Sequence, residues 1–119
     1  MRKLIAIIDD DQAIRGGVSS LLRSAGFDVR LYESAEAFLS DNRMPPPDVA
    51  LTDIQMPGMS GLDLQMVLKT RQPTLPLMFM TAFPEEALRK RVLADGAICF
   101  LSKPFKATEL LYWIEQALI

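Results

Sequence analysis

Four short apolar segments of this sequence are followed by side chains that can bind or transfer charged groups. In chain order, these side chains are Asp9, Asp10, Asp53, Thr81 and Lys103. Crowded carboxylates resist ionisation unless a cation lies among them, and magnesium, which prefers oxygen ligands and often binds carboxylates together with a phosphate, fits such a set. A lysine can balance charge on phosphate oxygens, and a threonine can donate a hydrogen bond to one of them. The set therefore predicts phosphoryl transfer beside magnesium, with Asp53 as the nucleophile.

Each of these pieces also has a simpler interpretation. A pair of acids after a strand is commonly a solvated turn or a helix cap, a Lys-Pro pair is usually part of a loop, and Thr81 could cap the following helix. The functional interpretation depends on all five side chains meeting at one place. The elements that carry them must therefore bring them together.

Short apolar segments alternate with amphipathic segments along the whole chain, which is typical of repeated βα units with a parallel sheet. Five units can be counted, and the expected strands are 4–8, 27–32, 48–52, 77–80 and 98–101. The first of them is apolar without alternation, as expected of a strand that is covered on both faces. Working residues of such sheets lie just beyond the carboxyl ends of the strands, so we expect the five side chains at one edge.

Caps and breakers mark the helices between these strands. Gly26 is expected to end the first helix, and Ser34 to cap the second, which the prolines 45–47 then break before a tight loop. Residues 84–86, a proline and two acids, favour the start of the fourth helix. The apolar residues expected along the third helix are Leu62, Met66 and Val67.

The bulk composition limits the possible functions. With 119 residues, half of them apolar, the chain is expected to form one domain over residues 1–119. The net charge is −2 and the lysines and arginines are scattered, which argues against direct binding of nucleic acid. The absence of histidine excludes histidine zinc sites, Ser-His-Asp catalysis and a phosphohistidine within this chain.

The cysteine content and the first apolar segment bear on location. Cys99 lies in an apolar run and has no second cysteine to pair with, which favours a buried, inert thiol and a reducing compartment. The apolar segment 4–8 is too short for a signal peptide or a membrane span. We therefore expect a cytoplasmic protein without membrane association.

Four motifs together resemble those of the response-regulator receiver family, and the resemblance covers nearly the whole chain. They are Ile8-Asp9-Asp10-Asp11, the loop from Asp53 to Gly61, Thr81-Ala82, and the run from Phe100 to Phe105. The resemblance implies a flavodoxin-like α/β fold, a (βα)5 three-layer sandwich with a five-stranded parallel sheet in the order 2-1-3-4-5.

The resemblance also implies roles for the site residues. Asp53 would be the phosphoacceptor and a ligand of Mg²⁺, Asp10 a direct ligand, and Asp9 a ligand through a bound water. The backbone carbonyl of Gln55 would complete the metal ligands. Lys103, Thr81 and the backbone amide of Ala82 would hold phosphoryl oxygens, and Lys103-Pro104 would be a cis peptide that directs the lysine toward the site.

Further residues would report or tune the reaction. Phe100 matches the aromatic residue that turns inward when the threonine moves, although a plain core position is the alternative. Gln55 and Phe83 occupy the two positions that tune the lifetime of the phosphoryl group in the family. The exposed aromatic pair expected on the last helix, Tyr112 and Trp113, could serve a partner or a second copy, or be ordinary surface residues.

The implied function is that of a phosphoacceptor in a two-component system. A sensor histidine kinase would be the donor, and the surface formed by the fourth helix, fifth strand and fifth helix would control an output. That output would be transcriptional, through a DNA-binding domain outside this chain or a phosphorylation-dependent homodimer. Beyond self-phosphorylation and autodephosphorylation, no enzyme activity is expected.

Two competing hypotheses belong to other classes. An aspartate-nucleophile phosphatase also uses aspartate and magnesium, but such enzymes usually have a second acid where this chain has Gln55. A flavodoxin-like binding module that works without phosphate is disfavoured because three acids, residues 9–11, follow the first strand in place of a glycine-rich phosphate loop.

Overall fold

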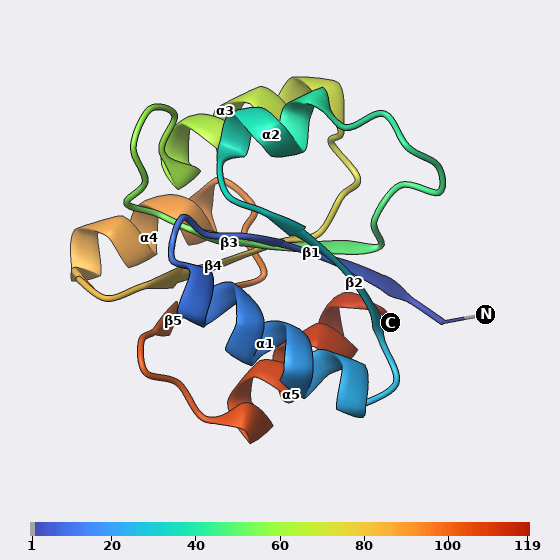
Figure 1. The fold of residues 1–119 in the computed structure, drawn as a ribbon. Coiled ribbons are helices and arrows are strands. Elements are labelled where there is room, and N and C mark those ends of the chain that lie inside the picture. Colours follow the sequence, from blue (N-terminus) through green and yellow to red (C-terminus); the bar gives the residue numbers. More distant parts are fainter. Residues whose placement is uncertain (1) are drawn as a thin grey trace.

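The computed structural model describes residues 2–119, in which strands and helices alternate regularly (Figure 1). The elements are β1 Leu4–Ile8, α1 Gln12–Ser24, β2 Asp28–Tyr32, α2 Ala35–Ser40, β3 Val49–Asp53, α3 Gly61–Arg71, β4 Leu77–Thr81, α4 Glu86–Ala94, β5 Cys99–Ser102 and α5 Ala107–Ala117. The predicted βα alternation is therefore confirmed, and no strand limit differs from the expected one by more than one residue.

The strands form one parallel sheet in the order β2-β1-β3-β4-β5, which confirms the predicted topology. Ile8 pairs with Thr52, and Asp53 pairs with Met80. Thr81 pairs with Ser102 in turn. Because this register aligns the last residues of neighbouring strands, the segments that follow β1, β3, β4 and β5 begin at a common edge.

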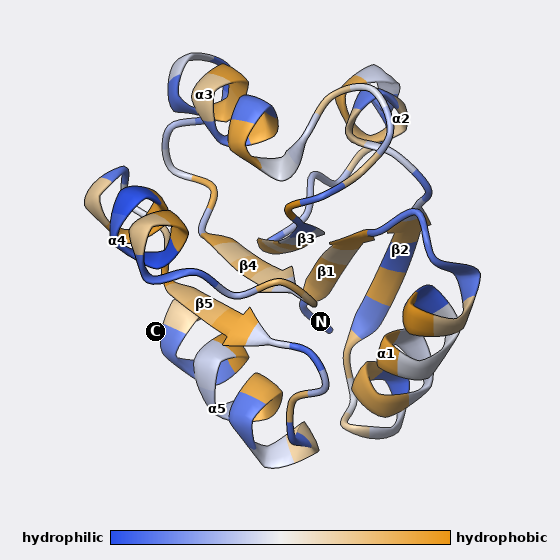
Figure 2. Ribbon diagram, turned by 90° about the vertical axis from the view of Figure 1, so that its left-hand side faces the viewer, coloured by the Kyte–Doolittle hydropathy of each residue, from blue (hydrophilic) through white to orange (hydrophobic). Residues whose placement is uncertain are grey.

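Two apolar cores lie on the two faces of the sheet. On β1, Ile5 and Ile7 face α1 and α5, whereas Ala6 and Ile8 face α2, α3 and α4. Figure 2 shows the same division, with the hydrophobic sides of the helices turned toward the apolar strands. The strands β1, β3 and β4 are buried along their whole length, which explains why the sequence of β1 is apolar without alternation, and the two cores confirm the predicted three layers.

Local hydrogen bonds set where the helices begin and end. Asp11 caps α1 by accepting from the amides of Ala13 and Ile14, and Ser34 caps α2 as predicted. Gly26 has a φ of 97° directly after the end of α1, a conformation that a residue with a Cβ rarely adopts.

The predicted end of α2 is wrong. The helix stops at Ser40, well before the prolines, because Asp41 leaves the helical conformation. Its carboxylate accepts a hydrogen bond from the Tyr32 hydroxyl at 2.5 Å and pairs with the Arg43 guanidinium at 2.7 Å. These bonds, which hold the pKa of Asp41 well below its ordinary value, compete with continuation of the helix.

Helix α3 turns Leu64 and Leu68 toward the core, and not Met66. Leu64 and Leu68 are buried, whereas Met66 is 51% exposed. From α3, the buried Gln65 side chain donates a hydrogen bond to the carbonyl oxygen of Val92 in α4 at 3.0 Å.

Two further expectations can be compared with the structure. Cys99 is buried, and burial raises the pKa of its thiol to about 12, as expected of an inert cysteine. Within residues 2–119, no helix combines the length and the apolar composition needed to cross a bilayer.

Candidate acidic site at the carboxyl edge of the sheet

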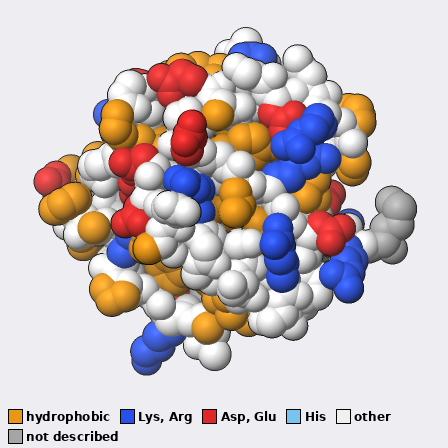
Figure 3. Space-filling model, viewed as in Figure 1, with side chains coloured by type: hydrophobic (Ala, Val, Ile, Leu, Met, Phe, Trp, Pro, Cys, Tyr) orange, Lys and Arg blue, Asp and Glu red, His pale blue; other side chains and the backbone are white. Residues whose placement is uncertain are grey.

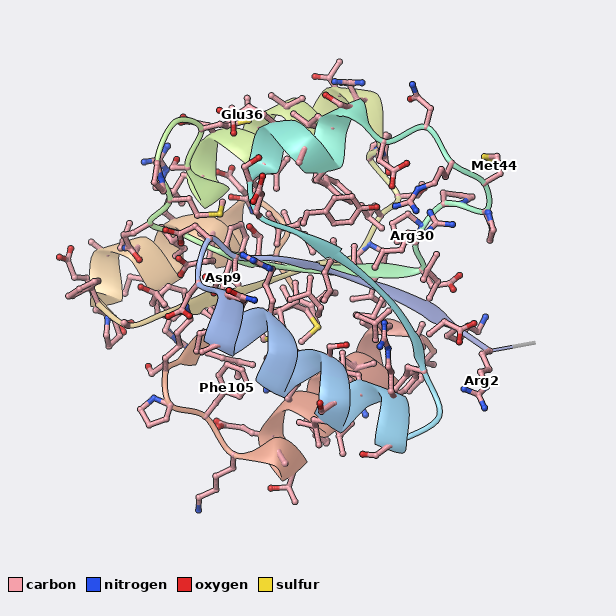
Figure 4. The ribbon with its side chains drawn as sticks, viewed as in Figure 1. Arg2, Asp9, Arg30, Glu36, Met44 and Phe105 are labelled. Atoms are coloured by element: carbon pink, nitrogen blue, oxygen red, sulfur yellow. The ribbon has the colours of Figure 1, made fainter. Side chains whose placement is uncertain are left out.

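Three carboxylates converge where β1 and β3 end. Asp9, Asp10 and Asp53 each offer an oxygen, and these oxygens lie within 4.8 Å of one another. Asp9 and Asp53 are buried, whereas Asp10 is exposed to solvent. Figure 4 places Asp9 between the end of β1 and the first turn of α1, and several acidic side chains gather on this side of the surface in Figure 3. The acid pair is therefore more than a solvated turn.

Lys103 supplies positive charge to this cluster. Its Nζ lies 2.7 Å from Oδ2 of Asp9 and 3.3 Å from Oδ1 of Asp53. Burial lowers the pKa of this ammonium group, but its hydrogen bond to Asp9 and the negative charges of Asp9 and Asp53 outweigh burial and raise the pKa overall. The predicted cis peptide between Lys103 and Pro104 is present. The lysine is therefore charged and directed at both buried carboxylates.

Asp53 is the buried carboxylate with an oxygen that lacks a hydrogen-bond partner. Burial and the negative charge of Asp9 raise its pKa to about 6, against the opposing effect of Lys103. Although Lys103 is nearby, Oδ1 of Asp53 accepts no hydrogen bond, the one buried side-chain polar atom of residues 2–119 in this state. Buried polar atoms without a partner are rare in native proteins, and they often mark a site for a ligand or an ion.

The donor set fits a hard divalent cation. Three carboxylates provide only oxygen ligands, and the exposed position of Asp10 leaves room for the waters that magnesium retains. A cation would also relieve the repulsion that raises the pKa of Asp53. The residues present are thus suited to Mg²⁺, while the ligand role of the Gln55 carbonyl stays a prediction.

Two hydrogen bonds hold Asp9 in place. Asp9 accepts a hydrogen bond from the amide of Asp11 at 2.9 Å, and its carbonyl oxygen accepts from Nη1 of Arg15 at 2.7 Å. Sequence reasoning missed Arg15, because a basic residue one turn into a helix carries no signal that it folds back onto the preceding strand.

Glycines hold the loop between β3 and α3. A Cβ at Gly61 would overlap with the carbonyl oxygen of Asp53 and lie 3.0 Å from Cα of Ile54. The Gly61 amide in turn donates to the Ile54 carbonyl at 2.9 Å. Two residues before Gly61, the amide of Met59 donates to Glu36 of α2 at 3.0 Å. The turn-forming composition predicted a loop here, but not this close approach to Asp53.

Thr81 is fully buried at the end of β4, and its hydroxyl is already engaged. Oγ1 donates to Oε1 of Gln55 at 2.6 Å and accepts from the amide of Phe83 at 3.0 Å. The alternative that Thr81 caps the following helix is wrong, because α4 begins at Glu86 and its N-cap residue is Glu85. The phosphoryl-binding roles expected of Thr81 and Ala82 stay predictions.

The residues expected to report the reaction lie on the β4 and β5 side of the sheet. Phe100 is half-buried and packs against the core beneath α4, and Phe83 is 67% exposed. On α5, Tyr112 is 54% exposed and meets the half-buried Trp113 edge to face at 5.1 Å. The expected partial exposure of this pair is therefore confirmed.

Curated relatives match almost the whole chain. It is 37% identical over 115 residues to the response regulator protein TodT of Pseudomonas putida, covering 97% of this chain and 51% of TodT. It is also 37% identical over 114 residues to the transcriptional regulatory protein FixJ of Bradyrhizobium diazoefficiens, covering 96% of this chain and 56% of FixJ. The chain thus spans about half the length of these relatives.

Solved structures and a family model agree with this similarity. The response regulator StyR superposes with a TM-score of 0.89 at 39% identity, covering 99% of this chain and 60% of StyR. The crystal structure of FixJ-N gives a TM-score of 0.88 at 30% identity, covering 99% of this chain and 94% of that structure. Residues 5–115 match the family model of the response regulator receiver domain. The chain belongs to the response-regulator receiver domain family.

Proposed function

We propose that residues 1–119 form a receiver domain in which Asp53 accepts a phosphoryl group from a sensor histidine kinase. The observation that carries this proposal is Oδ1 of Asp53, a buried oxygen without a hydrogen bond, next to two other carboxylates and the ammonium group of Lys103. Such an oxygen is available to attack phosphorus, and the surrounding charges can accommodate the incoming phosphate.

The transfer balances with the residues of this site. A carboxylate oxygen of Asp53 forms a bond to phosphorus while the P–N bond of the kinase phosphohistidine breaks, and its electron pair remains on the imidazole nitrogen. Lys103, already 3.3 Å from Asp53, would balance charge on the phosphoryl oxygens. Asp9, Asp10 and Asp53 would hold Mg²⁺, which would supply neutralising charge beside the phosphoryl group.

Phosphorylation would then favour another surface of the domain. The added negative charge offers hydrogen-bond acceptors toward which Thr81 and the Ala82 amide can move, and Phe100 would turn inward behind Thr81. The face of α4, β5 and α5 would carry the change to a partner, an attached domain or a second copy. Since FixJ is a transcriptional regulatory protein and NtrC of Salmonella typhimurium a DNA-binding transcriptional regulator, we propose a transcriptional output outside this chain. The lone buried Cys99 supports a cytoplasmic location.

Intact mass after incubation with acetyl phosphate and Mg²⁺ tests the acceptor. The parent should gain one phosphoryl group, Asp53→Asn should gain none, and Asp28→Asn, which alters an exposed acid at the start of β2, should behave as the parent. Labelling of Asp53→Asn to the level of the parent would overturn the proposal. Steady release of phosphate from simple esters, in place of a single labelling event, would instead favour a phosphatase.

The lifetime of the phosphoryl group should depend on Phe83. We propose that this bulky apolar side chain hinders the water that hydrolyses the acyl phosphate, because excluding water protects such an intermediate. Phe83→Glu should therefore lose its phosphoryl group faster than the parent, as measured by intact mass after removal of the donor. An unchanged decay rate would contradict this role of Phe83.

A further inference from the structure

The hydroxyl of Thr81 has no proton free for a phosphoryl group in this structure. A hydroxyl carries a single proton, and that of Thr81 is donated to Oε1 of Gln55 at 2.6 Å. A lone pair of the same oxygen accepts from the amide of Phe83 at 3.0 Å. Thr81 can therefore donate toward Asp53 only after its hydrogen bond to Gln55 breaks.

We propose that Gln55 is a positioning residue that holds Thr81 in its resting orientation and so sets the switching equilibrium of the domain. This inference rests on the proposed function, in which Thr81 moves toward a phosphoryl group on Asp53. The phosphoryl group must then compete with the amide oxygen of Gln55 for the same proton. Gln55 lowers the population of the active arrangement before phosphorylation and weakens the binding of a phosphoryl mimic afterwards.

The surroundings of Gln55 allow it to act as a fixed acceptor. Gln55 is exposed, but Ile54 and Met56 on either side of it are buried. Beyond them, the Gly61 amide donates to the Ile54 carbonyl at 2.9 Å and closes the loop. The backbone at Gln55 is thereby anchored on both sides, and its neutral amide can hold Thr81 without adding charge to the acidic site.

The same hydroxyl links this restraint to α4. The amide of Phe83 belongs to the segment between β4 and α4, and it donates to Thr81. Helix α4 has no side-chain hydrogen bond at its N-cap residue, Glu85. When Thr81 leaves Gln55, Phe83 changes partner as well, so one hydroxyl couples the loop after β3 to the start of α4.

NMR of the metal-free protein tests the restraint without phosphorylation. Three-bond couplings of the Thr81 methyl group report its χ1 rotamer. The parent should show one rotamer, whereas Gln55→Met, which keeps the length of the side chain but lacks a strong acceptor, should show averaged couplings. Gln55→Glu retains the acceptor and should remain like the parent. Parental couplings in Gln55→Met would overturn the proposal.

Binding of beryllofluoride with Mg²⁺ tests the consequence for switching. Gln55→Met should bind this mimic about fivefold more tightly than the parent, the factor expected for one net hydrogen bond. In a Thr81→Val background, the same substitution should have no effect, whereas an equal gain there would show that Gln55 acts by another route and would overturn the inference. A parent that binds no beryllofluoride would contradict the proposed function, while the couplings of Thr81 would still decide the role of Gln55.

Discussion

Helices α3 and α4 cover the same face of the sheet on either side of β4, but they are held very differently. Ser60 and Asp63 form a reciprocal capping box at the start of α3, and the buried residues of this helix are Gly61, Leu64, Gln65 and Leu68. Glu85, at the N-cap of α4, makes no side-chain capping bond, and Val92 is the one buried residue of that helix. The loop beside the acceptor is thus firmly held, whereas the neighbouring helix is not.

This difference separates two tasks within one face. Most helical stability comes from packing of an apolar face, so α4 should open locally at a lower free energy than α3. Asp53 lies next to the well-packed helix, because Gly61 directly contacts its backbone. The site can then stay in place while the loosely packed helix responds, and the following four predictions test this comparison.

Truncating one leucine in each helix should give the largest difference between α3 and α4 in the free energy of unfolding that is lost. Leu64 is fully buried in α3, so Leu64→Ala should lower the free energy of unfolding by about 4 kcal/mol through lost burial and a cavity. Leu88 of α4 is only half-buried, and Leu88→Ala should cost less than about 1 kcal/mol. Urea unfolding measures both, and similar losses would show that α4 is packed as firmly as α3.

The well-packed side also carries an electrostatic cost at Asp53. Its pKa is raised to about 6 from an ordinary 3.8, so the folded metal-free protein binds this proton more tightly than the unfolded chain. Stability from this group is therefore greatest below pH 3.8 and is lost as the pH rises through about 6. Asp53→Asn should be more stable than the parent at pH 7.5 by about 3 kcal/mol relative to its difference at low pH.

Urea unfolding in the presence of a chelator, at several pH values between 4 and 7.5, checks this dependence. A stability difference between Asp53→Asn and the parent that stays constant over this range would contradict the elevated pKa. Addition of Mg²⁺ should reduce the advantage of the variant, because a bound cation stabilises the ionised form of Asp53 in the folded parent.

The contact between Gly61 and Asp53 can be broken by one methyl group. Gly61→Ala would place a Cβ against the Asp53 carbonyl oxygen, and the backbone shift needed to relieve this overlap should cost about 2 kcal/mol. Gly16→Ala is a matched control in α1, where a Cβ meets no atom within 4 Å. That control should be neutral or stabilising, since alanine favours helices. Equal thermal shifts for both variants would show that the close approach has no energetic weight.

Capping substitutions should give the smallest effects, of opposite sign in the two helices. Ser60→Ala removes a capping bond of α3 and should destabilise the domain by about 1 kcal/mol, whereas Glu85→Ser can add one to α4 and stabilise it by up to about 1 kcal/mol. Hydrogen exchange should show slower exchange in α4 of the second variant. Unchanged exchange there would mean that capping does not limit the opening of α4.

The fold and the convergence of the site were predictable because strand burial and strand ends have strong local signals. An uninterrupted apolar run such as Leu4–Ile8, followed by acids, defines both a strand covered on two faces and the edge at which it ends. The position of Lys103 beside Asp9 followed from the same logic, although 94 residues separate them in the sequence.

What could not be predicted depends on the exact rotation and reach of single side chains. The sequence did not show which residues of α3 face the core, where Leu64 and Leu68 are buried and Met66 is 51% exposed. The end of α2 depends on the ion pair of Asp41 with Arg43. The hydrogen bond from Thr81 to Gln55 joins the end of β4 to the loop after β3, and no periodicity in the sequence predicts it.

The attachment of α4 is also uneven along its own length. Near its carboxyl end, Val92 is buried and its carbonyl accepts from Gln65, and just beyond the helix Asp95 pairs with Lys69 of α3 at 3.2 Å. Near its amino end, Glu86 pairs only within the helix, with Arg89. If α4 is displaced, it should therefore rotate about Val92. The largest displacement would be at its amino end, which lies nearest the acidic site.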